Sequence, residues 1–203
     1  MAHLPQQLID WDLQVWRYLH VEWRNDFLDA VVPYLRNQWT WAPLYLFLLL
    51  FVVGNFKKKG WLWCLFFLGT FALADQVSAH WLKPLFQRAR PCNDAALAKM
   101  IHIIVPCGSG YSFPSSHAAN HFALAFFMLV TFRFGRKWIA WSLVIWALLV
   151  SYAQVYVGVH FPLDVCCGAL IGIIIGCFTG WLFNLKFKLI QPLQLQENKP
   201  SAY

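Results

Sequence analysis

The sequence predicts an all-α, polytopic membrane helical bundle of about five transmembrane helices, preceded by an N-terminal interfacial amphipathic helix. Of its 203 residues, 60% are hydrophobic and 12% are charged, whereas soluble domains are about 45–50% apolar and about 25% charged. A chain of this size also has too little interior to bury so much apolar surface in water. The composition therefore excludes a disordered chain and a small disulfide-stapled secreted domain, and it makes the bilayer the expected solvent.

Residues 1–36 form the first predicted region, the interfacial N-terminal helix region. Eight charged residues interrupt it, so it lacks the roughly 20 mostly apolar residues of a spanning helix. The helical spacing of Leu8, Trp11, Val15 and Trp16 instead indicates an amphipathic helix lying among the lipid headgroups. No basic stretch followed by an apolar core and a small-residue cleavage site is present, so we do not expect a signal peptide.

Residues 37–190 form the predicted transmembrane domain, in which each span is an apolar run between polar segments. The expected spans are about Trp39–Val53, Trp61–Leu82, Phe113–Phe132, Trp138–Tyr152 and Leu163–Leu185. The first is short and carries aromatic residues of the kind that anchor helices at membrane interfaces. Residues 191–203 are polar and are expected to form a flexible cytoplasmic tail.

The net charge of +7 is informative once the basic residues are sorted by side of the membrane. Nine cations and the acid Glu197 fall on one side: Lys57, Lys58, Lys59, Arg133, Arg136, Lys137, Lys186, Lys188 and Lys199. The other side holds seven cations and seven acids, in the N-terminal region, in the loops 83–112 and 153–162, and at Asp164. The positive-inside rule places the first group in the cytoplasm. We therefore expect a bacterial inner (cytoplasmic) membrane protein whose second group faces the periplasm or exterior.

Two other features of the composition bear on compartment and partners. Cys92 and Cys107 both lie in the long outer loop, where an oxidising compartment would let them pair, with a stabilisation of about 3 kcal/mol for a ring of this size. No basic helix or aromatic-interleaved basic patch appears, so no nucleic acid partner is expected. The expected partners are the lipid bilayer and a substrate within it.

Three polar clusters interrupt the apolar chain, and the predicted topology brings all three to the outer membrane surface. They are Lys83–Pro91 at the end of the second span, Phe113–His117 at the start of the third, and Gln154–Asp164 between the fourth and fifth. Together they supply cations, a helix N-terminus and two histidines at one membrane depth. This combination predicts a phosphate site with acid–base groups.

Each cluster contributes a distinct element of that chemistry. Lys83 and Arg90 supply positive charge, and a guanidinium can hold two phosphate oxygens at once. Ser115 and Ser116 are expected at the positive end of a helix, whose unpaired backbone N–H groups favour an anion. These four residues are the expected phosphate ligands.

The two histidines are expected to do the chemistry. His160 and Asp164 are four residues apart, so in a helical turn the carboxylate can accept from one ring nitrogen and leave the other free to attack phosphorus. His117, on a different helix, can protonate the departing oxygen and later activate water. We predict His160, His117 and Asp164 as the catalytic residues.

The spacing of these residues resembles that of the type 2 phosphatidic acid phosphatase family, the acid-phosphatase-like membrane lipid phosphatases. The family pattern is Lys-x6-Arg-Pro, then Pro-Ser-Gly-His, then Ser-Arg-x5-His-x3-Asp. It maps onto Lys83, Arg90 and Pro91, then Pro114, Ser115, Ser116 and His117, then Ala153, Gln154, His160 and Asp164. The resemblance implies a helical bundle and a phosphatase that uses a phosphohistidine on His160, with no metal and no cofactor.

Two positions depart from the family pattern. Ser116 stands in place of the family glycine, and Gln154 stands in place of the arginine of the third motif. The second change replaces a phosphate-binding cation with a neutral amide, and charge-assisted contacts are roughly twice as strong as neutral ones. We expect Arg88 to fill part of this gap and Gln154 to act as a neutral phosphate ligand.

Other interpretations of the polar residues remain open at this stage. His117 and His121 are also four residues apart, as metal or haem ligands can be, although packing is the expected role of His121. Asp75 lies within the second span, where an acid is a functional candidate, but pairing with a polar group of a neighbouring span is expected. A non-catalytic lipid-phosphate-binding or transport membrane protein is the alternative function.

The substrate is expected to be a lipid phosphate or diphosphate that enters sideways from the outer leaflet. The candidate classes are polyprenyl diphosphate, phosphatidylglycerol phosphate, phosphatidate and lipid A phosphate. An outward-facing site suits the recycling of a cell-wall carrier lipid, so polyprenyl diphosphate is slightly favoured.

Overall fold

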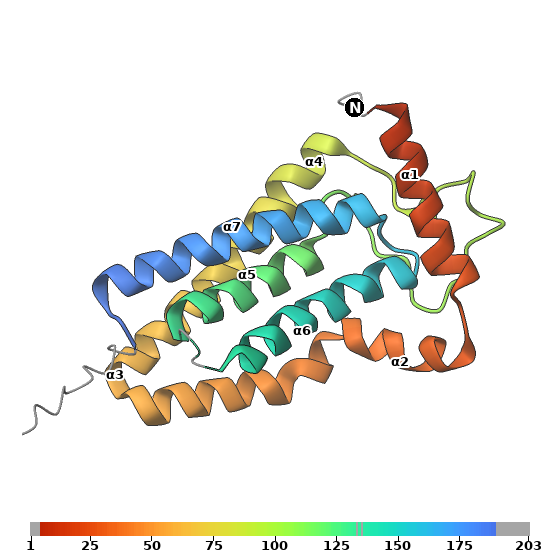
Figure 1. Cartoon of the computed structure of the whole chain (residues 1–203). Helices are drawn as coiled ribbons and strands as arrows, with labels where there is room; N and C mark the ends of the chain where they lie inside the picture. Colours follow the sequence, from red (N-terminus) through yellow and green to blue (C-terminus); the bar gives the residue numbers. More distant parts are fainter. Residues whose placement is uncertain (1–4, 133, 135, 190–203) are drawn as a thin grey trace, which may run out of the picture.

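The chain folds into a bundle of helices, seen in a computed structural model that describes residues 5–132, 134 and 136–189 (Figure 1). The helices are α1 (Gln6–Arg17), α2 (Asp26–Arg36), α3 (Ala42–Asp75), α4 (Lys83–Phe86), α5 (Ser116–Phe132), α6 (Lys137–Tyr156) and α7 (Pro162–Lys186). Short helical turns at Tyr18–Glu22, Gln38–Trp41, Gln76–Leu82 and Pro91–Asn93 connect them. The described residues contain no strand, which confirms the predicted all-α class. The expectations for Arg133, Glu197, Lys199 and the 191–203 tail lie outside these residues.

Three helical segments are long and apolar enough to cross a membrane: Gln38–Asn93, Lys137–Tyr156 and Pro162–Lys186, while α5 is a shorter apolar helix. The first segment holds both of the first two predicted spans. Lys57 breaks it with a φ of 52°, and a Cβ on Gly60 would lie 2.4 Å from the carbonyl oxygen of Val52. Hence α3 consists of two arms that run back from a tight turn at Lys57 (Figure 1).

The boundaries of α5 and α6 differ from those predicted. α5 begins at Ser116, three residues after Phe113, because the ring of Pro114 fixes its own φ and disfavours helical backbone before it. The Oγ of Ser115 accepts from the N–H of Ala118 at 3.4 Å and caps the first turn. α6 continues to Tyr156, which places Gln154 inside the helix rather than in the following loop.

The closest helix packing is between α5 and α7, where the backbones meet over a row of glycines. A Cβ on Gly172 or Gly176 would lie 2.3 Å from a carbonyl oxygen of α5, and one on Gly168 would lie 2.4 Å from that of Ser115, just before α5. Glycine at every fourth residue forms one face of a helix and lets two membrane helices approach closely. This packing fixes the start of α5 against the start of α7, where two of the three polar clusters lie.

Large apolar side chains cover the outer surface of the bundle. Those at least half exposed include Leu46, Phe47, Leu50, Leu65, Leu68, Trp141, Leu148, Leu170, Ile174, Phe178 and Trp181. Soluble monomers rarely expose contiguous apolar patches beyond a few hundred Å², and lipid-facing helices are expected to do so. With the spanning segments above, this surface makes the chain an integral membrane protein.

The two ends of the bundle differ in charge. The turn at Lys57–Lys59, the start of α6 with Arg136 and Lys137, and the end of α7 lie at one end (Figure 1), where the Nζ of Lys59 donates to the carbonyl of Lys188 at 3.4 Å. At the opposite end α1 lies across the junction of α6 and α7, with Asp12 and Trp16 fully buried. The polar clusters gather at this second end.

Candidate active site

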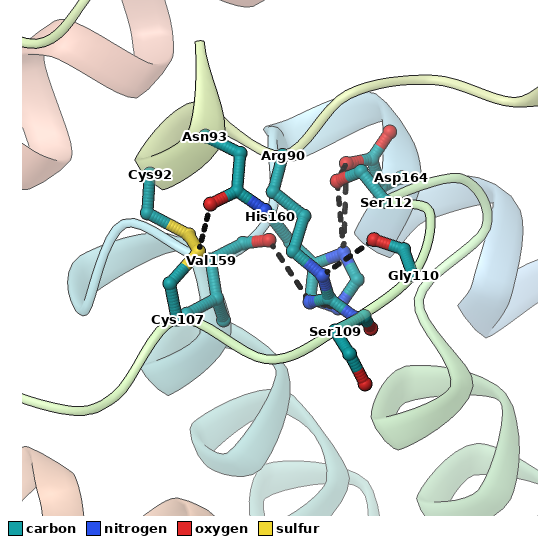
Figure 2. The surroundings of a disulfide bond; sticks show 10 residues. All are labelled: Arg90, Cys92, Asn93, Cys107, Ser109, Gly110, Ser112, Val159, His160 and Asp164. Carbon is teal, nitrogen blue, oxygen red and sulfur yellow. Dashed lines mark hydrogen bonds and ion pairs between the residues drawn. A yellow bond between two sulfur atoms is a disulfide. The ribbon is translucent and has the colours of Figure 1, made fainter.

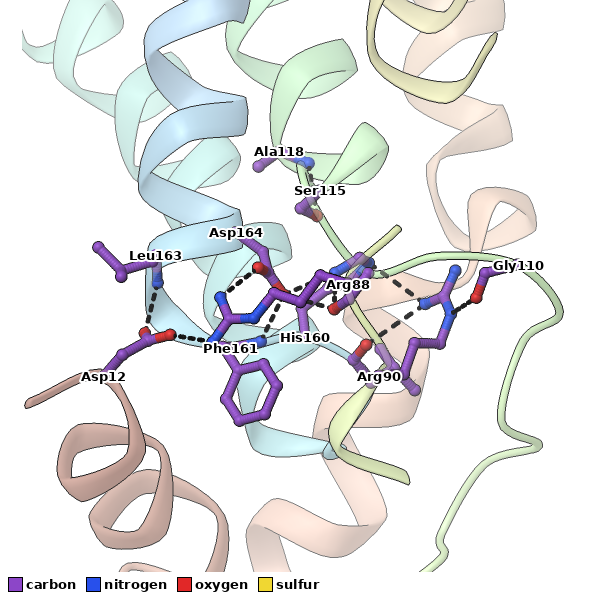
Figure 3. A network of polar contacts seen from close by, with 12 residues as sticks. Asp12, Arg88, Arg90, Gly110, Ser115, Ala118, His160, Phe161, Leu163 and Asp164 are labelled. Atoms are coloured by element: carbon purple, nitrogen blue, oxygen red, sulfur yellow. Dashed lines mark hydrogen bonds and ion pairs between the residues drawn. The ribbon is translucent and has the colours of Figure 1, made fainter. Parts of the chain in front are cut away.

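The three predicted clusters meet where α5 and α7 begin, next to the loop that follows α4 (Figure 3). The backbone N–H of Ser115 donates to the carbonyl of Asp164 at 2.9 Å, which joins the second cluster to the third. Arg90 of the first cluster contacts His160 of the third. The tertiary fold therefore assembles residues that are up to 81 positions apart, from Lys83 to Asp164.

His160 is oriented through its Nδ1 atom. This nitrogen lies 3.5 Å from Oδ2 of Asp164 and 3.2 Å from Oγ of Ser112. Ser112 also donates to Oδ2 of Asp164, and the N–H of Phe161 donates to the same oxygen at 2.8 Å. Because the Ser112 hydroxyl donates its hydrogen to Asp164, Nδ1–H faces two acceptors, Oγ of Ser112 and Oδ2 of Asp164, which leaves Nε2 as the unprotonated ring nitrogen.

Burial favours the neutral form of His160. The residue is 2% exposed, and desolvation lowers its pKa to about 4, although the neighbouring Asp164 acts in the opposite direction. The imidazole is therefore neutral at physiological pH, which a nitrogen nucleophile requires.

Arg90 is held by the outer loop beside this free nitrogen. Its Nε donates to the carbonyl of Gly110 at 3.2 Å, and its Nη2 donates to that of Ser109 at 3.4 Å. Its Nη1 donates to the carbonyl of Val159 at 3.3 Å and lies 3.4 Å from Nε2 of His160 (Figure 2). The guanidinium is thus fixed next to the atom expected to attack phosphorus.

A disulfide joins the two ends of the loop that holds Arg90. Cys92 and Cys107 are bonded with their Cα atoms 6.0 Å apart (Figure 2). Cys92 is two residues after Arg90, and Cys107 is two residues before Ser109. The bond therefore ties the two sides of the outer loop together directly beside Arg90 and its carbonyl acceptors Ser109 and Gly110.

Arg88 lies between two buried carboxylates. Its Nη1 donates to Oδ1 of Asp164 at 2.7 Å, and its Nη2 donates to Oδ2 of Asp12 at 2.5 Å. The guanidinium also stacks over the ring of Phe161, 4.0 Å from its centroid (Figure 3). Both terminal nitrogens of Arg88 are paired with acids, and these contacts suit a residue that positions Asp164. They differ from the expectation that Arg88 fills part of the gap left by Gln154 in binding phosphate.

Asp12 and Ser112 belong to the site, and the sequence analysis missed both. Asp12 accepts from Arg88 and from the backbone N–H of Leu163 at 2.7 Å, so α1 holds the first turn of α7. Burial raises the pKa of Asp12, and its bonds to Leu163 and Arg88 oppose that rise. The signal for Asp12 was its place four residues before Trp16 on the apolar face of α1. No comparable signal marked Ser112.

Lys83 and His117 line the other side of the site. Lys83 begins α4 and is half-buried, within electrostatic range of Arg90 and Asp164. His117 lies in the first turn of α5, within electrostatic range of His160 and Lys83. The site therefore holds one histidine from α5 and one from the loop before α7, with two cations beside them.

The predicted polar ligands Ser115, Ser116 and Gln154 differ in their surroundings. Ser115 caps α5, and the Oγ of Ser116 is buried without a hydrogen-bond partner in the described residues. Gln154 is fully buried, and its Nε2 donates to the carbonyl of Val150 in its own helix at 3.4 Å. The backbone carbonyl of Gln154 accepts from the N–H groups of Val159 and His160, so this residue shapes the loop that carries His160.

Asp75 and His121, two further polar residues of the helices, contact neighbouring groups. Nδ2 of Asn120 donates to Oδ1 of Asp75 at 3.1 Å, which confirms the expected pairing of Asp75 with a neighbouring helix. The Nδ1 of His121 donates to the carbonyl of His117 at 2.9 Å, and its ring packs edge-on against Trp146. These contacts fit the packing role expected for His121.

The chain is similar to several bacterial lipid phosphatases. Over 174 residues the chain is 37% identical to the lipid A 4'-phosphatase of Bacteroides thetaiotaomicron, covering 84% of this chain and 75% of that protein. It is 26% identical to the undecaprenyl-diphosphatase BcrC of Bacillus subtilis, covering 88% and 86% of the two chains. The crystal structure of a PAP2 type phosphatidylglycerolphosphate phosphatase from Bacillus subtilis superposes with a TM-score of 0.66 at 25% identity, covering 92% and 90%.

The fold, the site and these relatives define a membrane phosphatase. The PAP2 superfamily model matches residues 61–188, a range that contains all three motifs. The chain belongs to the PAP2 superfamily, as the motif spacing predicts.

Proposed function

We propose that this protein is a lipid phosphatase that forms a phosphohistidine on His160. The observation that carries the proposal is the arrangement around one imidazole, with Nδ1 held by Asp164 and Ser112 and Nε2 facing Arg90. A nucleophile oriented on one side and set beside a phosphate-binding cation on the other is the general arrangement of covalent catalysis.

In the first step, Nε2 of His160 attacks the phosphorus atom and the bond between phosphorus and the lipid oxygen breaks. Arg90 and Lys83 stabilise the negative charge on the equatorial oxygens. Nδ1–H keeps its contact with Asp164, which stabilises the positive charge that the ring acquires. His117 acts as the general acid and donates a proton to the departing oxygen, so the lipid leaves as an alcohol or as a lipid phosphate.

In the second step, His117 accepts a proton from water as that water attacks the phosphorus of phosphohistidine. The phosphorus–nitrogen bond breaks, the electron pair returns to Nε2, and inorganic phosphate is released. Ser115, Ser116 and the N–H groups of the first turn of α5 are proposed to bind phosphate oxygens, because that turn has N–H groups without partners in the helix. The scheme uses side chains and water alone, without a metal or cofactor.

We further propose that the two arms of α3 are separate membrane crossings, so that five helices span the bilayer with α1 at the interface. The concentration of Lys57–Lys59, Arg136, Lys137, Lys186 and Lys188 at the end opposite the site supports a cytoplasmic location for that end. The site would then face the periplasm or exterior of a bacterial inner membrane. The Cys92–Cys107 bond at the site end fits an oxidising compartment.

The relatives named above act, by their names, on lipid A phosphate, undecaprenyl diphosphate and phosphatidylglycerol phosphate, and we propose a substrate from these classes or phosphatidate. Phosphate release from a panel of these lipids in detergent, with and without EDTA, tests the proposal with the wild type and His160→Ala. We expect release by the wild type in EDTA and its loss in the variant. Release that survives the substitution would overturn the mechanism, and release abolished by EDTA would require a metal. Binding without release would favour the non-catalytic alternative.

A further inference from the structure

A cavity of about 600 Å³ lies between the two arms of α3 and the start of α5, and His117 is part of its wall. A second cavity, of about 400 Å³, lies between the end of α2 and the outer loop, and it shares Arg36, Gln38 and His117 with the first. His117 is the proposed proton donor to the leaving oxygen. Both cavities therefore begin where the leaving group departs.

The lining of the larger cavity changes with depth in the bundle. At the site end it is polar, with Arg36, Asp75, Ser116, Asn120 and His121 beside His117. Deeper along the same helices it is apolar, with Leu49 on the first arm of α3, Phe67 on the second and Leu124 on α5. From Ser116 to Leu124 the helical rise of about 1.5 Å per residue gives a depth of about 12 Å. Such a cavity fits a polar headgroup above an acyl chain.

Several polar atoms of this lining have no hydrogen-bond partner in the described part of the chain. They are Nε of Arg36, Oγ of Ser116, Oδ1 of Asn120 and Nε2 of His121. Asn120 is 8% exposed, and a buried polar atom without a partner is costly enough to require an explanation. A bound ligand that forms hydrogen bonds with these atoms explains why they have no partner within the protein.

Of these free atoms, Nε of Arg36 is a donor, Oγ of Ser116 can donate or accept, and the other two are acceptors. Asn120 uses Nδ2 to donate to Oδ1 of Asp75, which also lines the cavity, so its own Oδ1 is left as an acceptor. His121 donates through Nδ1 to the carbonyl of His117, so Nε2 of the neutral ring is an acceptor as well. Acceptors of this kind require O–H or N–H donors on the ligand.

We propose that this cavity binds the leaving lipid, an inference that rests on the proposed function. Asp75, Asn120 and His121 then select a leaving group rich in hydroxyl and amide groups, which is the chemistry of an acylated amino sugar. A leaving phosphate, as from polyprenyl diphosphate, offers mainly acceptors, which suit Arg36 but not the acceptors of Asp75, Asn120 and His121. Diacylglycerol offers one hydroxyl. An acylated amino sugar offers several O–H and N–H donors, and its acyl chain matches the apolar depth.

The test compares the ratio of kcat/KM for three phosphorylated lipids in wild type and Asn120→Ala. The lipids are lipid A bisphosphate, phosphatidate and farnesyl diphosphate, measured as phosphate release in detergent. We expect the wild type to prefer lipid A, and the variant to lose about 10-fold on lipid A, as expected when a buried hydrogen bond to substrate is removed. Its activity on phosphatidate should change far less. Asp75→Asn should give the same pattern.

Asn184→Ala is the matched control, because Nδ2 of Asn184 also donates across the bundle, to Val130 at 2.8 Å, but at the opposite end. It should lower all three activities equally or not at all. Equal losses on all lipids in Asn120→Ala, or a wild-type preference for phosphatidate or farnesyl diphosphate, would overturn the inference while leaving the proposed function intact. Failure of the wild type to exceed His160→Ala on any lipid would overturn the proposed function itself.

Discussion

Nε2 of His160 lies 3.4 Å from Nη1 of Arg90. The other ring nitrogen faces Asp164, so Nδ1 fixes the orientation of the imidazole ring and Nε2 faces a cation. Arg90 is itself held by the carbonyls of Gly110, Ser109 and Val159. The distance between the two residues therefore depends on the outer loop, which holds Arg90, as well as on α7, which carries Asp164.

Arg88 is predicted to act by positioning Asp164. Replacing it with Gln removes the charge that lies between Asp12 and Asp164, and displacement of the catalytic carboxylate is expected to lower kcat on the order of 100-fold with little change in KM. Asp12→Asn should lower kcat as well, and the double variant should lose less than the two single losses combined, because the residues act through one contact network. A rise in KM at unchanged kcat would instead show that Arg88 binds phosphate.

Much of this site follows from the sequence because its motifs carry their own local geometry. The spacing of His160 and Asp164 places both in one turn, and Pro114 sets the start of α5 close to Ser115. The contribution of Asp12 could not be predicted in the same way, because it depends on how α1 lies across the bundle. Arg88 and Gln154 were assigned to phosphate from charge and motif position alone, whereas Arg88 pairs with acids brought to it by the tertiary fold and Gln154 donates within its own helix.

The disulfide is predicted to support Arg90. Replacing both Cys92 and Cys107 with Ser should lower the free energy of unfolding by about 3 kcal/mol and raise KM for the lipid phosphate, because the loop that holds the guanidinium becomes less constrained. Thermal unfolding in detergent and steady-state kinetics measure the two effects. Cys166→Ser, at an exposed free cysteine, is the control and should change neither. An unchanged KM in the double variant would show that the disulfide does not contribute to phosphate binding.

Gly172 is predicted to be essential for the contact between α5 and α7. A Cβ there would lie 2.3 Å from the carbonyl oxygen of Ala119, so Gly172→Ala should destabilise the protein by about 1–3 kcal/mol and lower activity, since the two helices carry Ser115 and Asp164. Gly69→Ala is the matched control, because a Cβ at Gly69 meets nothing within 4 Å. Equal thermal stability of the two variants would contradict the proposed close packing.

The row of glycines on α7 also shows that composition alone does not predict which spanning helices pack against each other. The apolar runs predict spanning helices, but the choice of neighbours depends on which faces can approach. Gly168, Gly172, Gly176 and Gly180 are visible in the sequence at intervals of four, and they are the one local signal for this pairing. The turn at Lys57 has no such signal, because a non-glycine residue adopts a positive φ there.

Stability is predicted to fall on acidification because of His160. Its pKa of about 4 in the folded protein lies below the usual value of about 6.5 in the unfolded chain, so between these values the unfolded state binds more protons. The contribution, on the order of 3 kcal/mol, is present above about pH 6.5 and is lost as the pH falls toward 4. Thermal unfolding from pH 8 to pH 4 should show a steeper loss in wild type than in His160→Gln. Parallel curves would contradict the burial of a neutral imidazole.

The most direct test of the account is the capture of the phosphoenzyme. Protein mixed with a ³²P-labelled lipid phosphate and stopped in alkaline detergent within the first turnovers should carry label that is stable to base and lost in acid. Peptide mapping should place this label on His160, and His160→Ala should carry none. Label on another residue, or continued phosphate release by His160→Ala, would contradict the central claim.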